Sequence, residues 1–189
     1  PIRQSVHKRL PWLIILLGLG LVVSSVVGLF EGVVAQLTIV ICFQSLILDM
    51  AGNVGTQSLA VTIRVLMDES LTGKQKLQLV FKEMRIGFCN GLLLGVLSFA
   101  VIGLFIFLFK GKTMMFAFSV SACIGIALLL AMLISSAVGT CIPLFFKKIH
   151  IDPAVASGPL ITTVNDLVAV VTFYGLSWLF LIEMLHLAG

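Results

Sequence analysis

Charged residues are scarce in this chain of 189 residues: they make up 11% of it, whereas hydrophobic residues make up 60%. A soluble domain usually carries about 25% charged residues. This scarcity excludes a disordered chain, a nucleic-acid-binding protein and an ordinary cytosolic enzyme. The formal net charge of +4 rests on only 12 basic residues, so their positions matter more than their sum. The composition predicts a helical membrane protein with several spans.

Thiol and imidazole ligands are also few, with four cysteines and three histidines. The cysteines all lie in apolar stretches and form no C-x-x-C pair, so we expect them to be small buried side chains. His7, His150 and His186 lie at chain or helix ends and far apart in the sequence. This spacing does not fit a zinc site. No histidine lies deep in an apolar stretch to serve as a base for a serine nucleophile, which disfavours an intramembrane hydrolase.

Long runs with little or no charge divide the chain into five segments, each at least as long as the roughly 20 residues that a membrane-spanning helix needs. We predict a basic cytoplasmic lead-in over residues 1–9 and an all-α membrane domain over residues 10–189, with spans over residues 10–30, 33–64, 80–109, 113–147 and 153–186. The second, fourth and fifth spans exceed a bilayer core of about 30 Å. They are therefore expected to be tilted, broken or extended into the cytoplasm.

The positions of the basic residues predict the orientation. Five spans place the two termini on opposite sides of the membrane. If the N-terminus is cytoplasmic, only Lys110 and Lys112 of the 12 basic residues lie outside, which is the bias that membrane proteins show. We therefore expect a cytoplasmic N-terminus and an external C-terminus.

The third span has two features to which we assign no binding or catalytic role. Glu83 and Arg85, near its start, are expected at a solvated helix end. Gly87, Gly91 and Gly95 then recur every four residues, and this spacing lets another helix approach closely.

Two carboxylates, Asp49 and Asp166, lie deep within the spans, where ionised groups are costly. Counted from the ends of their spans, both fall near the bilayer midplane and could line one pathway. Ser45, Asp49, Asn53 and Gln57 recur at every fourth residue, which places them on one face of the second span. Interhelical hydrogen bonding is the alternative interpretation of this stripe, and helix packing is the alternative for Asp49.

Local features of the same two spans suggest a transport site. Gly52 and Gly55 in the second span, and Gly158–Pro159 in the fifth, predict loosened backbone that presents carbonyl groups. Thr162 shares a face with Asp166 at a spacing of four residues. Broken polar helices near the midplane are typical of transport sites.

The available groups suit a hard cation. No lysine or arginine lies deep in a span, which disfavours an anion, and no cluster of thiolates or imidazoles suits a soft metal. A twofold dimer that places two Asp166 carboxylates across its axis would balance a divalent ion. Mg²⁺ is often held through one or two carboxylates while it keeps much of its water. The residue types alone leave Ca²⁺, Na⁺ and H⁺ open.

Two motifs carry a family resemblance, residues 49–58 (DMAGNVGTQS) and residues 152–163 (DPAVASGPLITT), the second followed by Asp166. Together with residues 9–13 (RLPWL) and 82–87 (KEMRIG), they resemble the transmembrane domain of the MgtE-type magnesium transporter/channel family, which is related to the eukaryotic solute-carrier magnesium transporters. The match follows the same order of five helices. Departures from the usual pattern, which put the selectivity in question, occur at Met50, Ala51 and Asn165.

The resemblance implies a homodimer in a bacterial plasma membrane, with an ion pathway on the twofold axis between the second and fifth spans. It implies that paired Asp166 carboxylates hold a hydrated Mg²⁺, with Asn53, Gly158 and Thr162 close to the pathway. Asp152 would lie near the cytoplasmic mouth. Family members commonly carry a helical N-domain and paired CBS modules that sense Mg²⁺, and these regulatory domains are absent from this sequence. Because the chain begins with Pro1 rather than Met, we expect a piece of a longer protein.

We therefore predict a channel or transporter that moves Mg²⁺ into the cytoplasm down its electrochemical gradient. No chemical step is needed, so we do not expect an enzyme or a cofactor other than the transported ion. The alternative mechanism is a Na⁺- or H⁺-coupled exchanger with Asp49 as the coupling carboxylate. A structural subunit that conducts nothing is a further alternative, against which the two deep carboxylates argue.

Overall fold

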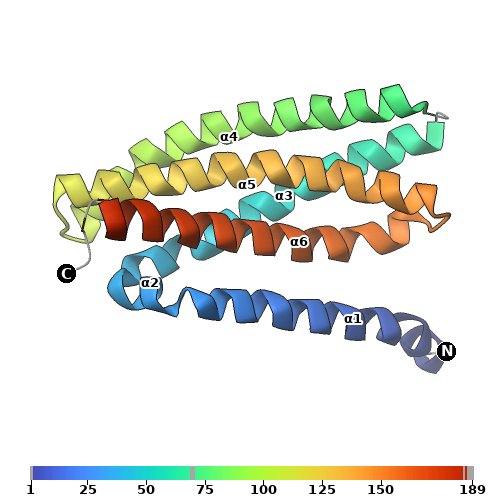
Figure 1. Ribbon diagram of the computed structural model, residues 1–189, viewed down its shortest axis with the longest axis horizontal. Helices are drawn as coiled ribbons and strands as arrows, with labels where there is room; N and C mark the ends of the chain where they lie inside the picture. The colour runs from blue at the N-terminus through green and yellow to red at the C-terminus, as the bar shows by residue number, and fades with distance from the viewer. Residues whose placement is uncertain (1, 69–70, 185, 187–189) are drawn as a thin grey trace.

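Long helices running side by side make up the computed structural model, which describes all residues except 1, 69–70, 185 and 187–189 (Figure 1). The described residues contain no strand, so the predicted all-α fold is confirmed. The elements in chain order are α1 (Ile2–Leu29), α2 (Glu31–Gln36), α3 (Thr38–Asp68), α4 (Gly73–Phe109), α5 (Met114–Lys148), α6 (Pro153–Leu176) and the π-helix η1 (Ser177–Met184).

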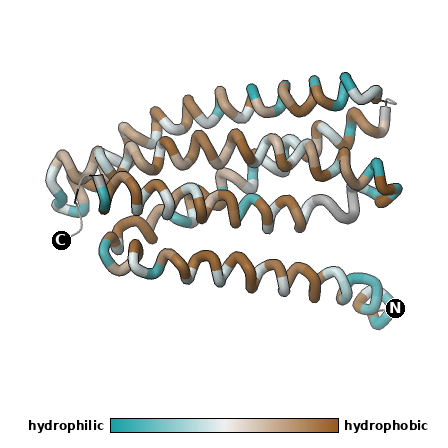
Figure 2. Tube along the Cα trace, viewed as in Figure 1, coloured by the Kyte–Doolittle hydropathy of each residue, from teal (hydrophilic) through white to brown (hydrophobic). Residues whose placement is uncertain are grey.

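Five of these helical stretches are long and apolar enough to cross a membrane, as predicted: Ile2–Leu29, Thr38–Met67, Gly73–Phe109, Met114–Lys148 and Gly158–Glu183. Hydrophobic residues fill the middle of the helices, and hydrophilic residues gather toward their ends (Figure 2). The two termini lie at opposite ends of the bundle (Figure 1). An odd number of spans requires this arrangement.

The helix bounds differ from the predicted spans. α1 already begins at Ile2, so the basic lead-in is helical, and α4 begins at Gly73 rather than near residue 80. A capping box explains the early start of α4, because the Thr72 side chain accepts from the Gln75 backbone while the Gln75 side chain accepts from the Thr72 backbone N–H at 2.8 Å. The short helix α2 between the first two spans was not predicted.

α3 is one continuous α-helix, so the predicted loosening at Gly52 and Gly55 is wrong. The Thr56 hydroxyl donates to the Gly52 carbonyl at 3.0 Å and to the Asn53 carbonyl at 2.9 Å. α6 likewise continues through Pro159. The predicted second span is instead divided at Leu37, between α2 and α3, and the fifth changes from α-helix to π-helix at Ser177.

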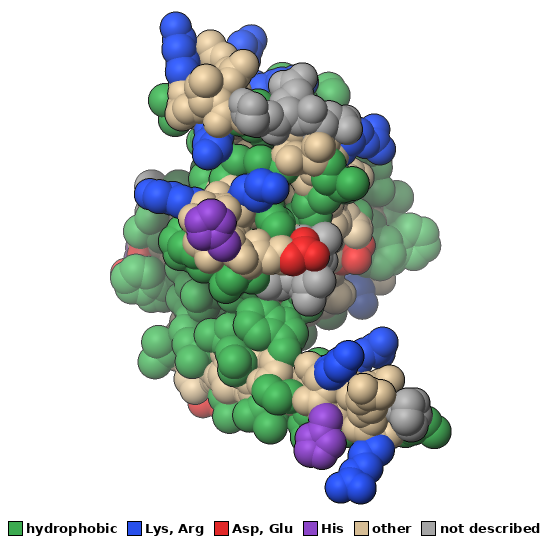
Figure 3. All heavy atoms as spheres, turned by 90° about the vertical axis from the view of Figure 1, so that its right-hand side faces the viewer, with side chains coloured by type: hydrophobic (Ala, Val, Ile, Leu, Met, Phe, Trp, Pro, Cys, Tyr) green, Lys and Arg blue, Asp and Glu red, His purple; other side chains and the backbone are tan. Residues whose placement is uncertain are grey.

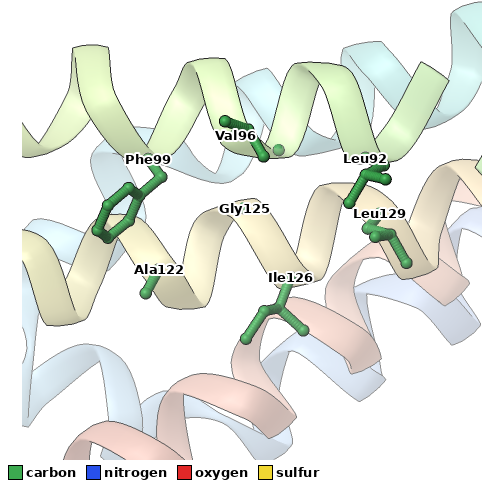
Figure 4. Close-up of a pocket in the computed structure, with 8 residues that line it drawn as sticks. Leu92, Val96, Phe99, Ala122, Gly125, Ile126 and Leu129 are labelled. Carbon is green, nitrogen blue, oxygen red and sulfur yellow. The ribbon is translucent and has the colours of Figure 1, made fainter. Parts of the chain in front are cut away.

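α5 lies at the centre of the bundle and packs against α3, α4 and α6. Its contact with α4 is backbone to backbone. A Cβ atom on Gly91 would lie 2.9 Å from the Leu129 Cα, and one on Gly95 would lie 2.8 Å from the Gly125 carbonyl oxygen. Figure 4 shows the two helices side by side at Gly125. The prediction that the glycine ladder allows close helix packing is confirmed.

α1 lies on the outside of the bundle. It contacts α6, and none of its residues is buried. The exposed side chains of its middle part are apolar (Figure 2). Such a surface suits contact with lipid chains.

Two predictions about burial are wrong. Glu83 was expected in solvent, but it is only 4% exposed, and its Oε2 accepts a hydrogen bond from the Ser58 hydroxyl of α3 at 3.0 Å. The expectation of buried cysteines holds for Cys123 alone, because the other three are exposed in the protomer, namely Cys42, Cys89 and Cys141. An apolar residue on a membrane helix can face lipid, so apolar surroundings in the sequence do not fix its burial.

We expect Ser58→Ala to lower the free energy of unfolding by about 1–3 kcal/mol, because the buried Glu83 carboxyl group loses a donor. Unfolding in detergent, followed by circular dichroism, measures the change. Replacing both partners, as in Ser58→Ala with Glu83→Leu, should recover part of the loss, since no polar group is then left without a partner. Ser25→Ala is the matched control, because that hydroxyl bonds only to the Leu21 carbonyl of its own helix. A Ser58→Ala protein as stable as the parent would refute this role.

Candidate ion site

A row of polar side chains follows α3 on the side that its own bundle leaves uncovered. The α3 polar face consists of Ser45, Asp49, Asn53 and Gln57, all of which are exposed in the protomer. On the opposite side of the helix, Ala51 and Ser58 are buried. The structure therefore places these four residues together, as their spacing predicts, and turns them away from the protomer core.

Within the α3 polar face, the Asn53 amide orients Asp49. Its Nδ2 donates to Asp49 Oδ2 at 3.2 Å, one helical turn away. The second carboxylate oxygen is left available to an ion or to water. The backbone carbonyls of Gly52 and Asn53 accept hydrogen bonds from the Thr56 hydroxyl in addition to the backbone hydrogen bonds of the α-helix. Side-chain oxygens, not loosened backbone, are thus the ion ligands that α3 offers.

α6 carries the second carboxylate. Asp166 is half-buried and forms no hydrogen bond or ion pair with the described part of the chain. Thr162 lies one turn before it and is exposed, with its hydroxyl donating to the Gly158 carbonyl at 3.2 Å. The three residues Gly158, Thr162 and Asp166 therefore follow one another along α6 at steps of one turn.

The two carboxylates lie at a similar height in the bundle. The Asn165 Nδ2 donates to the Ala51 carbonyl at 3.3 Å, which joins α6 to α3. The two helices run in opposite directions (Figure 1), so Asp49 and Asp166 lie on the same side of that contact. At about 1.5 Å per residue, the two positions lie within about one helical turn of each other along the axis. The prediction that they share one level is consistent with this contact.

Asp152 is set apart from these residues. It is exposed and directly precedes Pro153, the first residue of α6. A carboxylate there is favoured by the positive end of the helix dipole. It lies at one end of the bundle, and the helix start gives it a structural reason to be acidic.

Sequence reasoning missed two polar residues around the site, Gln44 and Asn90, and noted a third, Asn165, without assigning it a role. Gln44, next to the α3 polar face, instead accepts a hydrogen bond from the Tyr174 hydroxyl of α6. Asn90 of α4 lines a groove of about 400 Å³ together with Asn53 and Gln57. Asn165 joins α6 to α3. The signal available in the sequence was an amide side chain in an otherwise apolar helix. Such a residue does not show which neighbouring helix its side chain faces.

The oxygen donors on these two helices are hard ligands. Carboxylate, amide and hydroxyl oxygens of this kind suit Mg²⁺ or Ca²⁺ better than a soft metal. Among the described residues, no three side chains of His, Cys, Asp or Glu gather around one point. One protomer therefore offers one carboxylate from each of α3 and α6 at this level.

Fold and site together define a class: a polytopic helical membrane protein with a carboxylate-bearing face on two of its spans. Residues 44–176 match the family described as "MgtE: Divalent cation transporter". The chain is 35% identical, over 94% of its length, to the magnesium transporter MgtE of Bacillus subtilis and to that of Enterococcus faecalis. It is 30% identical, over 92% of its length, to the magnesium transporter MgtE of Thermus thermophilus.

The chain therefore belongs to the MgtE family of divalent cation transporters. Membership confirms the resemblance seen in the two motifs, and the family is one of transporters, not of enzymes. The chain spans only 36–37% of the length of these three relatives.

Proposed function

We propose that this chain is the membrane domain of a homodimeric Mg²⁺ channel that admits the ion to the cytoplasm across the plasma membrane. The observation that carries the proposal is the α3 polar face. Asp49, Asn53 and Gln57 are exposed in the middle of a helix long enough to cross a membrane. Lipid chains cannot satisfy such groups, so a second protomer or a water-filled path would cover them.

A twofold axis beside α3 and α6 would bring two Asp166 carboxylates together. One carboxylate per chain leaves a dication half neutralised, whereas two match its charge. Mg²⁺ gives up its water reluctantly, so the pair would hold a hydrated ion. Asp49, Asn53, Gln57, Gly158 and Thr162 would then line the pathway, with Asp152 near its cytoplasmic mouth.

The charge distribution supports the direction of transport. Figure 3 views one end of the bundle, where lysine, arginine and histidine side chains gather. The N-terminus and the α3–α4 and α5–α6 connections all lie at this end (Figure 1). From the usual bias of basic residues toward the cytoplasm, we propose that this end lies inside. An inside-negative potential then favours the entry of a dication by about 4.6 kcal/mol per 100 mV.

Purified protein in liposomes that contain a Mg²⁺-sensitive dye tests the proposal. We expect Mg²⁺ entry with a Mg²⁺ gradient alone, faster entry with an inside-negative potential, and no change when a Na⁺ or pH gradient is added. Empty liposomes are the control. Entry that requires a Na⁺ or pH gradient, and that Asp49→Asn uncouples, would instead establish the exchanger. No Mg²⁺ entry under any of these conditions would refute transport by this domain.

A further inference from the structure

Three helices meet at one point behind the candidate ion site. Gly55 of α3 is buried there, and a Cβ atom on it would collide with the Asn165 amide of α6. From the other side, a Cβ atom on Gly139 of α5 would collide with the Gly55 carbonyl. Glycine is thus required at position 139, which faces the backbone of α3, and at position 55 as long as Asn165 fills the space beside it.

Asn165 fills the space that Gly55 leaves. Its side chain is fully buried, and its Nδ2 donates to the Ala51 carbonyl at 3.3 Å. Its Oδ1 is buried with no hydrogen-bond partner among the described residues. Because a buried polar atom without a partner is costly, an apolar residue would fill this space at less cost. The costlier residue therefore needs a reason other than packing.

The direction of Asn165 fixes the direction of Asp166. Successive residues of an α-helix point about 100° apart. When the Asn165 amide is tied to α3, the neighbouring carboxylate must point away from that contact, on the same side as Thr162. A second hydrogen bond between the two helices lies further along α6, where the Tyr174 hydroxyl donates to Gln44 of α3. Asp166 lies between these two hydrogen bonds, so α6 can neither slide nor turn freely on α3.

We propose that Asn165 is a positioning residue that holds Asp166 at a fixed height and rotation beside the ion pathway. The proposal rests on the proposed function, in which Asp166 contacts the hydrated ion. A hydrated Mg²⁺ is held by directed hydrogen bonds from its water shell to the carboxylates. A turn of α6 by a fraction of the angle between neighbouring residues would misalign both members of the pair at once.

Asn165→Leu tests the proposal, because leucine is of similar size and lacks the donor. We expect the half-saturating Mg²⁺ concentration for entry into liposomes to rise about tenfold, the lower end of the effect of removing a residue that orients an ion-binding side chain. The amount of folded protein and its melting temperature should stay close to those of the parent. Gln78→Leu makes a similar change from amide to leucine at an exposed position of α4 and should behave as the parent.

A pair of variants distinguishes the role of the hydrogen bond from Asn165 to Ala51 from the role of packing by the Asn165 side chain. Gly55→Ala alone should reduce the amount of folded protein, since the new methyl group collides with the Asn165 amide. Adding Asn165→Ala removes the collision and should restore the folded protein, but the raised half-saturating concentration should remain. If the double variant instead regains the parent's half-saturation, Asn165 acts by packing alone and the proposal fails.

The outcomes also distinguish this proposal from the proposed function. If Asn165→Leu takes up Mg²⁺ with the parent's half-saturation while Asp166→Asn is inactive, positioning by Asn165 is refuted and the ion site stands. If Asp166→Asn takes up Mg²⁺ as the parent does, the ion site itself is refuted, and the role of Asn165 falls with it.

Discussion

Asp166→Asn should reduce Mg²⁺ entry at least about 100-fold, because losing a charge partner in a partly desolvated site costs several kcal/mol. Asparagine matches aspartate in shape, so the substitution removes the charge and leaves the helix intact. In a twofold dimer it removes two charges at once, and the dication would then face amides only. The measurement is dye-reported Mg²⁺ entry into liposomes at equal amounts of dimeric protein. Entry at the parent's rate would refute the site.

Two controls sharpen this result. Glu183→Gln removes a carboxylate of the same charge from an exposed position at the far end of the fifth span, and it should leave Mg²⁺ entry unchanged. Parent and Asp166→Asn chains that are co-expressed with different affinity tags and purified through both tags give dimers in which one Asp166 alone is replaced. Entry should then fall to an intermediate value, with a weaker preference for divalent over monovalent ions. A mixed dimer that behaves as the parent would show that the two carboxylates do not act as a pair.

The sequence was sufficient to predict the spans and the glycine ladder, because both depend on local patterns. A run such as residues 86–109 is apolar whatever packs against it, and glycines four residues apart share one side of any helix. The ends of the helices were harder to predict. Basic residues such as Lys8 and Lys76 end an apolar run but do not end a helix, since the α-helix continues readily in water.

The α3 polar face was predictable for the same reason, since a spacing of four residues predicts both its shared side and the hydrogen bond from Asn53 to Asp49. The burial of Glu83 and the hydrogen bond from Asn165 to α3 were not predictable in this way. Each depends on which residue of another helix lies opposite, Ser58 in the first case and Ala51 in the second. Such pairings follow from helix tilt and rotation, which a linear pattern does not specify.

These differences have a common physical basis. In a bilayer, apolar surface is satisfied by lipid as well as by protein, so hydropathy marks the spans without showing which faces meet. Backbone contact and polar ties then determine the arrangement of the helices. Here the contact of Gly55 with Gly139 and the bond from Asn165 to Ala51 fall at the level of the two deep carboxylates. Helix arrangement and the position of the candidate ion site therefore depend on the same few residues.

Gly95→Leu should prevent the protein from folding stably, with a loss of about 3 kcal/mol or more, because an added side chain has no space between two touching backbones. A Cβ atom there would already lie 2.8 Å from the Gly125 carbonyl oxygen. Because that oxygen belongs to the backbone, α4 and α5 must separate to admit the leucine. The melting temperature in detergent and the yield of monodisperse protein measure the effect. Gly95→Ala should show a smaller loss in the same direction.

Gly18→Leu is the matched control, since nothing lies within 4 Å of a Cβ atom at that position of α1. It should fold as the parent does. The contact is mutual, because a Cβ atom on Gly125 would lie 2.8 Å from the Gly95 carbonyl oxygen. Gly125→Leu should therefore be as damaging as Gly95→Leu, and the two losses should not add, since helices that one leucine has already separated leave room for the second. A stable Gly95→Leu protein would show that α4 and α5 do not touch here.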